Sequence, residues 1–193
     1  MATMYHLFFG VLLIVICRSV GAIHYPLGRQ CVASLAETPR SDLRQKIIDI
    51  AQREIGVQEA TGNNDGKRVE EYLRYTGLGK GYAWCAAFAS WCYGQAGLPE
   101  PRNPWSPALF PNARSYCRGE ACGRSETMKA INAADVFGIY GQHAGRINHV
   151  GLITRLQGSY LITIEGNSNN RVESRRRHLS TIYAIADWSG GRL

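Results

Sequence analysis

The pattern of apolar residues changes once along the chain, and that change restricts the fold more than any other feature. Up to about residue 96, apolar residues recur at helical spacing, which predicts helices at 42–55, 69–73 and 85–96. After about residue 135 they gather in short runs rich in Ile, Val and Tyr, separated by turn residues. We predict strands in these runs, at 136–140, 149–155, 160–165 and 181–186. Helices followed by strands predict an α+β domain and not a parallel α/β sheet.

The helix predicted at 85–96 carries small residues along one face. Cys85, Ala89, Cys92 and Ala96 recur at helical spacing and therefore form one stripe. Small side chains let a helix backbone come close to whatever it packs on, and we expect that to be the sheet. Prolines crowd residues 100–112 and argue against a regular element there.

The first residues predict a compartment. The apolar run 7–16 is too short to span a membrane, which takes about 20 residues. It has the length of a signal-peptide core, and Ala22 is a small residue of the kind that signal peptidase requires. We therefore predict a signal peptide at 1–22, an extended lead-in at 23–40 and a single domain at 41–193. The protein is then secreted or periplasmic, and only the signal segment meets a membrane. Because no Lys or Arg precedes the apolar core, a membrane-tethered form stays an alternative.

The formal charge of +7 favours polyanionic partners. Export makes anionic wall polymers a better candidate than nucleic acid, for which the sequence has no motif. The basic residues are scattered except for the run 175–177. No His, Asp and Glu cluster has metal-ligand spacing, and the loop 63–66 offers one carboxylate, which favours a plain turn over a calcium site. We predict neither a metal nor a cofactor.

Cysteine arithmetic allows a free thiol. The chain has six cysteines, and removing the signal peptide takes away Cys17, which leaves an odd number. Outside the cytoplasm thiols tend to pair, so at least one stays free. Cys117 and Cys122 enclose a short loop and are a candidate disulfide, whereas the pairing of Cys31 and Cys92 stays open.

Cys85 stands where a thiolate is stabilised. It begins a predicted helix directly after a glycine-rich loop, where free N–H groups and the helix dipole lower the pKa of a thiol. The alternative is a buried structural cysteine, the interpretation that we favour for Cys92 inside the same helix. A nucleophilic thiol also needs a base and a group that orients the base. His149 begins a clear strand, although a buried core histidine is the alternative. Glu165 and Asn167 end the next strand and face one side.

Three segments together resemble a known family. GYAWCAAFASWC, INHVGLI and LITIEGNSNN occur in the order found in the CHAP domain, the cysteine, histidine-dependent amidohydrolase/peptidase. The resemblance covers roughly residues 55–188. It implies a papain-like α+β fold in which N-terminal helices, including the nucleophile helix, pack on a C-terminal antiparallel sheet. It also implies hydrolysis of amide or peptide bonds in bacterial peptidoglycan.

The same resemblance implies residue roles. Cys85 would be the nucleophile and His149 the base, with Glu165 and Asn167 orienting the imidazole. Tyr82 and Trp84 are candidates for substrate binding, and Tyr82 could join the Cys85 N–H in holding the oxyanion.

Several points stay open at this level. The bond cut could be that of an N-acetylmuramoyl-L-alanine amidase or of an endopeptidase. A non-catalytic wall-binding module and an antibacterial toxin with the same chemistry are alternatives. The oligomeric state is not indicated.

The strands 149–155 and 160–165 also predict a register. A three-residue loop at 156–158, with Gly158 in its left-handed position, places His149 directly opposite Glu165. A two-residue loop at 157–158 would instead place Gly166 there and turn Glu165 to the other face. We expect the three-residue loop.

Overall fold

Residues 38–190 are described by the computed structural model of the chain. The predicted signal segment, Cys31 and most of the predicted lead-in lie outside these residues. The first elements are helical, namely α1 (Thr38–Arg53), α2 (Lys67–Tyr75), α3 (Cys85–Ala96) and the 3-10 segment η1 (Ser106–Leu109). Two short elements, η2 (Gly119–Gly123) and α4 (Ser125–Ala130), follow the strand β1 (Ser115–Arg118). The remaining elements are β2 (Val136–Gly141), β3 (Arg146–Gln157), β4 (Tyr160–Ser168), β5 (Arg171–His178), η3 (Leu179–Thr181) and β6 (Ala184–Ala186).

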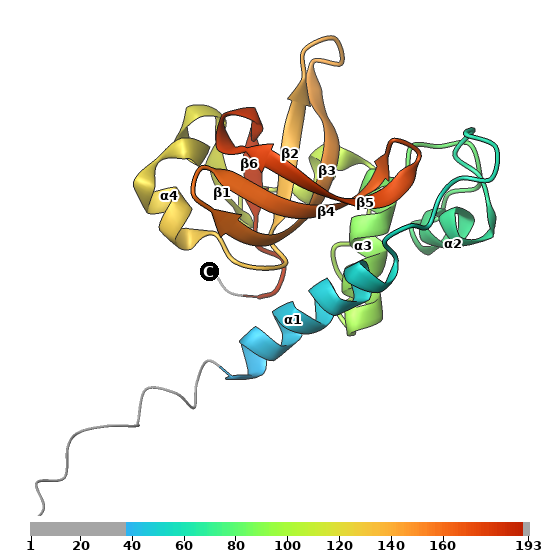
Figure 1. Cartoon of the computed structure of the whole chain (residues 1–193), viewed down its shortest axis with the longest axis horizontal. Coiled ribbons are helices and arrows are strands. Elements are labelled where there is room, and N and C mark those ends of the chain that lie inside the picture. Colours follow the sequence, from blue (N-terminus) through green and yellow to red (C-terminus); the bar gives the residue numbers. More distant parts are fainter. Residues whose placement is uncertain (1–37, 191–193) are drawn as a thin grey trace, which may run out of the picture. The chain divides into compact units, whose positions relative to one another are not determined.

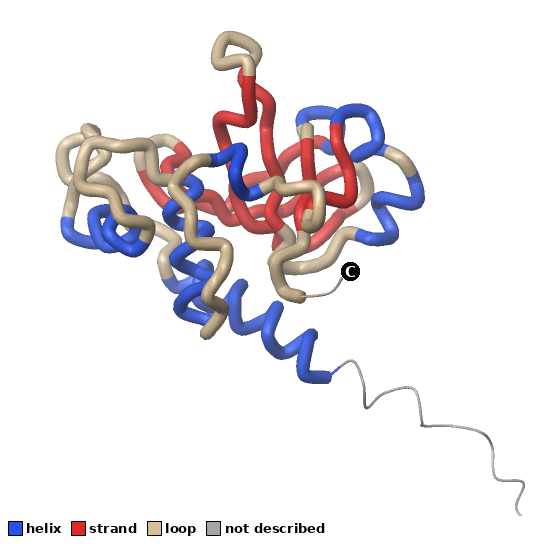
Figure 2. The backbone as a smooth tube through the Cα atoms, turned by 180° about the vertical axis from the view of Figure 1, so that it is seen from behind, coloured by secondary structure: helices blue, strands red, loops and turns tan. Residues whose placement is uncertain are grey.

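The strands form one six-stranded antiparallel sheet in the order β1-β6-β2-β3-β4-β5. Figures 1 and 2 show α1, α2 and α3 grouped together, apart from α4. The α+β fold predicted from the sequence is therefore confirmed, with the helix of Cys85 packed against an antiparallel sheet as in the papain-like arrangement. No helix within residues 38–190 has the length and apolar character needed to cross a membrane.

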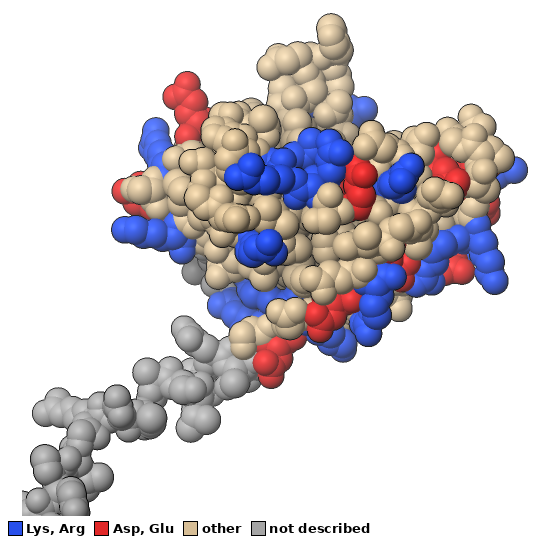
Figure 3. Space-filling view, in the orientation of Figure 1, with Lys and Arg blue, Asp and Glu red and all other residues tan. Residues whose placement is uncertain are grey.

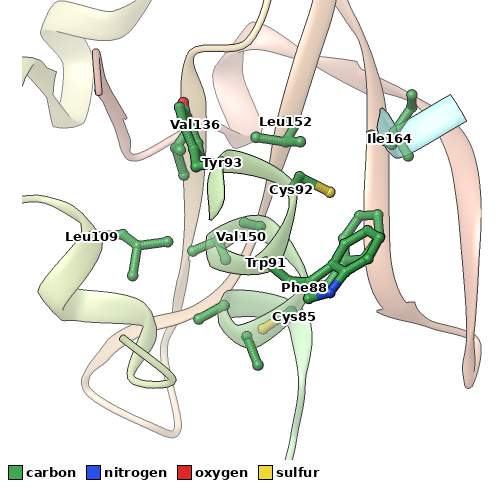
Figure 4. Packing of buried hydrophobic residues seen from close by; sticks show 14 of the residues in the cluster. Cys85, Phe88, Trp91, Cys92, Tyr93, Leu109, Val136, Val150, Leu152 and Ile164 are labelled. Atoms are coloured by element: carbon green, nitrogen blue, oxygen red, sulfur yellow. The ribbon is translucent and has the colours of Figure 1, made fainter. Parts of the chain in front are cut away.

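Helix α3 is the centre of the main core. All of its residues except Gly94 and Gln95 are buried, and its bounds match the prediction. Figure 4 shows its side chains beside Val150 and Leu152 of β3 and Ile164 of β4. At Gly166 the helix and the sheet come so close that a Cβ atom there would lie 2.6 Å from the Cβ of Phe88. The close approach expected from the small-residue stripe thus also uses a glycine of the sheet.

A second, smaller core lies on the other face of the sheet. It includes Phe137, Ile153 and Ile185, together with Cys117 and Cys122. The two cysteines form a disulfide, so that prediction is confirmed. Cys92 is free and fully buried, in agreement with a core role.

Two strands were not predicted. Strand β1 is short, and β5 is an edge strand rich in Arg in which half-buried and exposed side chains alternate over residues 173–178. Lys and Arg side chains gather over the part of the surface where Figure 1 draws β4 and β5 (Figure 3). The strand predicted at 181–186 is shorter than expected, because the 3-10 segment η3 occupies its beginning.

The predicted register of the β3–β4 hairpin is wrong. Gln157 pairs with Tyr160, so the turn consists of Gly158 and Ser159 alone. Gly158 has a φ of 58°, whereas Ser159 has no positive φ. Two-residue hairpins of type II′ require a left-handed residue at the first of the two turn positions, and glycine supplies it here. Gly158 therefore favours a two-residue turn in which it is the first residue.

A bulge then shifts the pairing near the site. The register changes between Ile153 and Arg155, after which Ile153 pairs with Thr163. Continued in this register, Gly151 lies opposite Glu165 and His149 lies opposite Asn167. The predicted direct pairing of His149 with Glu165 is consequently wrong, although the two side chains meet by another route.

Candidate active site

Cys85 is the first residue of α3 and is only 5% exposed. The first intrahelical bond in this turn is donated by the N–H of Phe88 to the carbonyl of Trp84. The N–H groups before Phe88 are among those that an α-helix leaves without intrahelical partners, and they carry the positive end of the helix dipole. A negative charge on or near the Cys85 sulfur is therefore stabilised by the backbone.

Three further groups surround the Cys85 sulfur. The hydroxyl Oγ of Ser106 lies 3.5 Å from Sγ, and His149 and the backbone N–H of Val150 are hydrogen-bonded to it. Burial opposes ionisation of the thiol, but the hydrogen bond and the charge of His149 outweigh it and lower the pKa of Cys85. Cys85 is thus an activated thiol in a nearly closed site.

His149 stands between the thiol and a carboxylate. Its Nε2 lies 2.7 Å from Oε2 of Glu165, which leaves Nδ1 to face Cys85. Burial opposes the charged imidazolium, but Cys85 and Glu165 stabilise it and raise the pKa of His149 to about 9. The lowered thiol pKa and the raised imidazole pKa describe a thiolate paired with an imidazolium.

Glu165 is fully buried and accepts hydrogen bonds from three side chains. Besides His149, Arg177 donates to both carboxylate oxygens, at 2.9 and 2.5 Å, and the hydroxyl of Thr163 donates at 2.6 Å. Burial raises the pKa of a carboxyl, but these donors, with Arg177 first, lower the pKa of Glu165 to about 2. Glu165 is therefore a carboxylate at any pH near neutrality.

Arg177 was missed because it lies on the unpredicted strand β5. The run 175–177 was interpreted only as surface charge. In β5 the side chains alternate, and Arg177 is a half-buried member of the alternation between two exposed neighbours. Side chains of a strand alternate between its two faces, and this alternation was the only sequence feature that could indicate that Arg177 points inward.

Glycine at 151 makes the contact of His149 with Glu165 feasible. A Cβ atom at Gly151 would lie 2.8 Å from the Cγ of Glu165. The Glu165 side chain therefore passes over the position opposite it in the sheet and reaches His149 diagonally. Diagonal neighbours are within reach of long side chains, so the contact survives the register that differs from the prediction.

Asn167 lies elsewhere in the site. One end of its amide is 3.2 Å from Oε1 of Glu59, and the other is 3.2 Å from the backbone N of Trp84. Both contacts are satisfied when the amide nitrogen donates to Glu59 and its oxygen accepts from the Trp84 N–H. Asn167 thus braces the residue before the nucleophile, and of the two residues predicted to orient the imidazole of His149, Glu165 is the one bonded to it.

Glu59 organises the same loop and was not singled out from the sequence. This buried carboxylate accepts the indole N–H of Trp84 at 2.9 Å and the backbone N–H of Asn64 at 2.9 Å. Trp84 is fully buried and stacks on Tyr72, so its predicted contact with substrate is wrong. Its indole is needed inside, where it fixes the turn that leads into α3.

Two exposed aromatic side chains belong to the segments that carry Cys85 and Ser106. Tyr82 lies three residues before Cys85 and is 58% exposed, and Trp105, next to Ser106, is 56% exposed. Both are candidates for contact with substrate, whereas Trp91 is buried. Within residues 38–190 no group of three His, Cys, Asp or Glu side chains is placed to hold a metal ion.

An α+β fold that joins a helix-terminal thiol, an imidazole and a carboxylate has the architecture of a cysteine hydrolase. Residues 77–167 match the CHAP domain family, and this segment includes Cys85, His149, Glu165 and Asn167. This segment of the chain is therefore similar to the CHAP domain, whose family comprises cysteine, histidine-dependent amidohydrolases and peptidases.

Solved structures also resemble the chain. One is titled "Structure of the Resuscitation Promoting Factor Interacting protein RipA mutated at E444"; it is 12% identical, with a TM-score of 0.45 over 80% of this chain and 65% of that one. A second, "The crystal structure of Ly7917", is 12% identical, with a TM-score of 0.39 over 74% of this chain. The chain spans 65% and 61% of the lengths of these two proteins. No curated protein sequence matches it.

Proposed function

We propose that the protein is a secreted cysteine hydrolase that cleaves amide or peptide bonds of bacterial peptidoglycan. The observation that carries the proposal is the chain of contacts at the start of α3. Cys85 is hydrogen-bonded to His149, and the other ring nitrogen of His149 lies 2.7 Å from the buried carboxylate of Glu165. This arrangement supplies an activated nucleophile, a proton carrier and a group that fixes the imidazole.

The geometry supports acyl transfer in two stages. The Cys85 thiolate attacks the substrate carbonyl carbon, the S–C bond forms, and the carbonyl π electrons move to the oxygen. The oxyanion then collapses, the C–N bond breaks, and the imidazolium of His149 gives its proton to the leaving nitrogen. The product of this stage is a thioester on Cys85 and a free amine.

Water completes the cycle. Neutral His149 removes a proton from a water molecule, whose oxygen attacks the thioester carbonyl. The S–C bond breaks, the acid product leaves, and the thiolate–imidazolium pair is restored. Glu165 stays ionised throughout and stabilises the imidazolium whenever it forms.

Three observations support peptidoglycan as the substrate. The CHAP family match names amidohydrolase and peptidase chemistry. The exposed rings of Tyr82, three residues before Cys85, and of Trp105, next to Ser106, offer flat apolar surfaces of the kind that bind sugar and peptide groups. The Cys117–Cys122 disulfide suits a protein that works in an oxidising compartment outside the cytoplasm.

The test is mass spectrometry of fragments released from purified peptidoglycan. New amino-terminal L-alanine together with glycan free of peptide identifies an amidase, and new ends within the stem or cross-bridge identify an endopeptidase. Cys85→Ser should release nothing, while Cys92→Ser, the other free cysteine within residues 38–190, should act like the wild type. Wall binding without any fragment would overturn the proposal and leave a binding module.

A further inference from the structure

Ser106 places a buried hydroxyl beside the nucleophile. Its Oγ is 3.5 Å from the Cys85 sulfur, and it has no other hydrogen-bond partner among residues 38–190. Taking a hydroxyl out of water is costly unless it forms hydrogen bonds. A weak contact with a thiol compensates this cost poorly, so the hydroxyl is available for a stronger acceptor during the reaction.

The segment around Ser106 is held rigidly before substrate arrives. Ser90 of α3 donates to the carbonyl of Asn103 at 3.1 Å and accepts the Asn103 N–H at 3.2 Å. The Asn103 side chain in turn accepts the N–H of Trp105 at 2.9 Å. At the far end of η1, the indole of Trp188 donates to the carbonyl of Leu109 at 2.9 Å. The hydroxyl therefore belongs to a turn that is fastened at both ends.

We propose that the Ser106 hydroxyl is the second donor of the oxyanion hole, beside the backbone N–H of Cys85. The proposal rests on the thiol mechanism of the proposed function. Tyr82, considered for this role from the sequence, is mostly exposed and forms no hydrogen bond within the described residues. Ser106, by contrast, is buried at the reacting atom itself.

The chemistry of the attack requires such a donor. When the Cys85 sulfur bonds to the carbonyl carbon, the negative charge passes from sulfur to the substrate oxygen bound to that carbon. An oxyanion donor works at roughly 2.7–3.1 Å from this oxygen. An Oγ atom 3.5 Å from the sulfur is close enough to the reacting carbon to lie at such a distance from the new oxyanion, and rotation about its C–O bond points the hydrogen toward it. Ser106 keeps its proton throughout, so proton transfer remains with His149.

A different role for Ser106 is to stabilise the thiolate alone. The hydrogen bond from Ser106 is one of the contacts that lower the pKa of Cys85, after those of His149. Two reactions of the thiolate distinguish these roles, because only one of them forms an oxyanion. Alkylation by iodoacetamide displaces iodide and forms no oxyanion, whereas acylation by p-nitrophenyl acetate passes through one.

The experiment compares both probes on Ser106→Ala across a pH series. We expect acylation, followed as the burst of p-nitrophenolate, to slow by roughly 10²- to 10³-fold. The alkylation rate of Cys85, measured above its pKa, should stay within about 2-fold of wild type. Ser115→Ala is the matched control, since it also removes a buried hydroxyl, one with no partner within the described residues, and should change neither rate.

The outcomes are distinct. If both rates of Ser106→Ala fall together, the hydroxyl serves the thiolate and the proposal is overturned, as it is if neither falls. Ser106→Thr and Ser106→Val have the same size and differ in one hydroxyl, so they give the same comparison if the alanine variant does not fold. Because neither probe contains peptidoglycan, an inactive wild type on peptidoglycan would refute the proposed substrate and leave this inference testable.

Discussion

Removing Arg177 tests whether the site depends on a charge outside the thiol, imidazole and carboxylate. We choose Arg177→Met, which keeps the length of the side chain and loses both hydrogen bonds to Glu165. Breaking a buried ion pair from one side costs about 3–5 kcal/mol. The Arg177 side chain is 24% exposed, and solvent screens part of that energy. We therefore expect the free energy of unfolding to fall by about 2–3 kcal/mol.

The pH dependence gives an independent measure. The pKa of Glu165 is lowered from 4.5 to about 2 in the folded state. Its contribution to stability is therefore fully present above about pH 4.5 and is lost as the pH falls toward about 2. Arg177→Met removes the main favourable cause of that shift. Urea unfolding at several pH values should show a variant that is less stable near neutrality and depends less on pH in this window.

The same substitution should move the alkaline limb of the pH profile of kcat/KM to higher pH. Activity needs the imidazolium of His149, whose pKa is about 9, so it declines as the pH rises through that value. Without Arg177 the charge of Glu165 acts on His149 alone, and the His149 pKa should rise further. Arg176→Met is the control, because Arg176 lies over the ring of Tyr160 and does not contact Glu165. An Arg177→Met variant with the stability and alkaline limb of this control would refute the reasoning.

Three further predictions concern neighbouring features. His149→Gln removes the group that most favours the thiolate, so the pH midpoint of iodoacetamide alkylation at Cys85 should rise above the wild-type midpoint and past the ordinary thiol value of 9. Gly151→Ala should displace Glu165 and lower kcat by about 10-fold or more. Gly123→Ala is the control, because its added Cβ would meet no other atom, and it should leave kcat unchanged. An unchanged kcat of Gly151→Ala would contradict the diagonal contact of Glu165 with His149. Reducing the Cys117–Cys122 disulfide should lower the free energy of unfolding by about 2 kcal/mol, since the loop is short. Urea unfolding with and without reductant measures it, and a loss beyond 4 kcal/mol, roughly that of a far longer loop, would contradict the estimate.

The sequence predicted α3 well because both of its ends carry strong local signals. Glycines break the chain before it, and Gly97, with a φ of 102°, provides the left-handed residue that ends it. Cys85 was therefore placed at the helix start without knowledge of the fold. His149 and Glu165 were also found, since each lies in a run with clear strand character.

The parts that were missed depend on contacts distant in the chain. The bulge after Ile153 has no local signature, and it changes which residue of β4 lies opposite His149. Ser106 lies in a proline-rich segment without periodicity, so only the folded chain reveals that η1 carries it to Cys85. Arg177 looked like surface charge because its partner, Glu165, lies on the neighbouring strand.

The contacts of the site form one line of alternating charge. It runs from the Arg177 guanidinium through the Glu165 carboxylate and the His149 imidazolium to the Cys85 thiolate. Each isolated charge would be costly to bury, but each here touches an opposite charge, and the four together are neutral. The attack on a carbonyl moves the last negative charge from sulfur to the substrate oxygen. That oxygen then lies beside the helix N–H groups and the Ser106 hydroxyl, so the alternation is preserved through the transition state. Arg177 and Ser106 therefore stand at the two ends of one electrostatic arrangement, and we expect an arginine of an edge strand to affect the reactivity of a thiol in a helix.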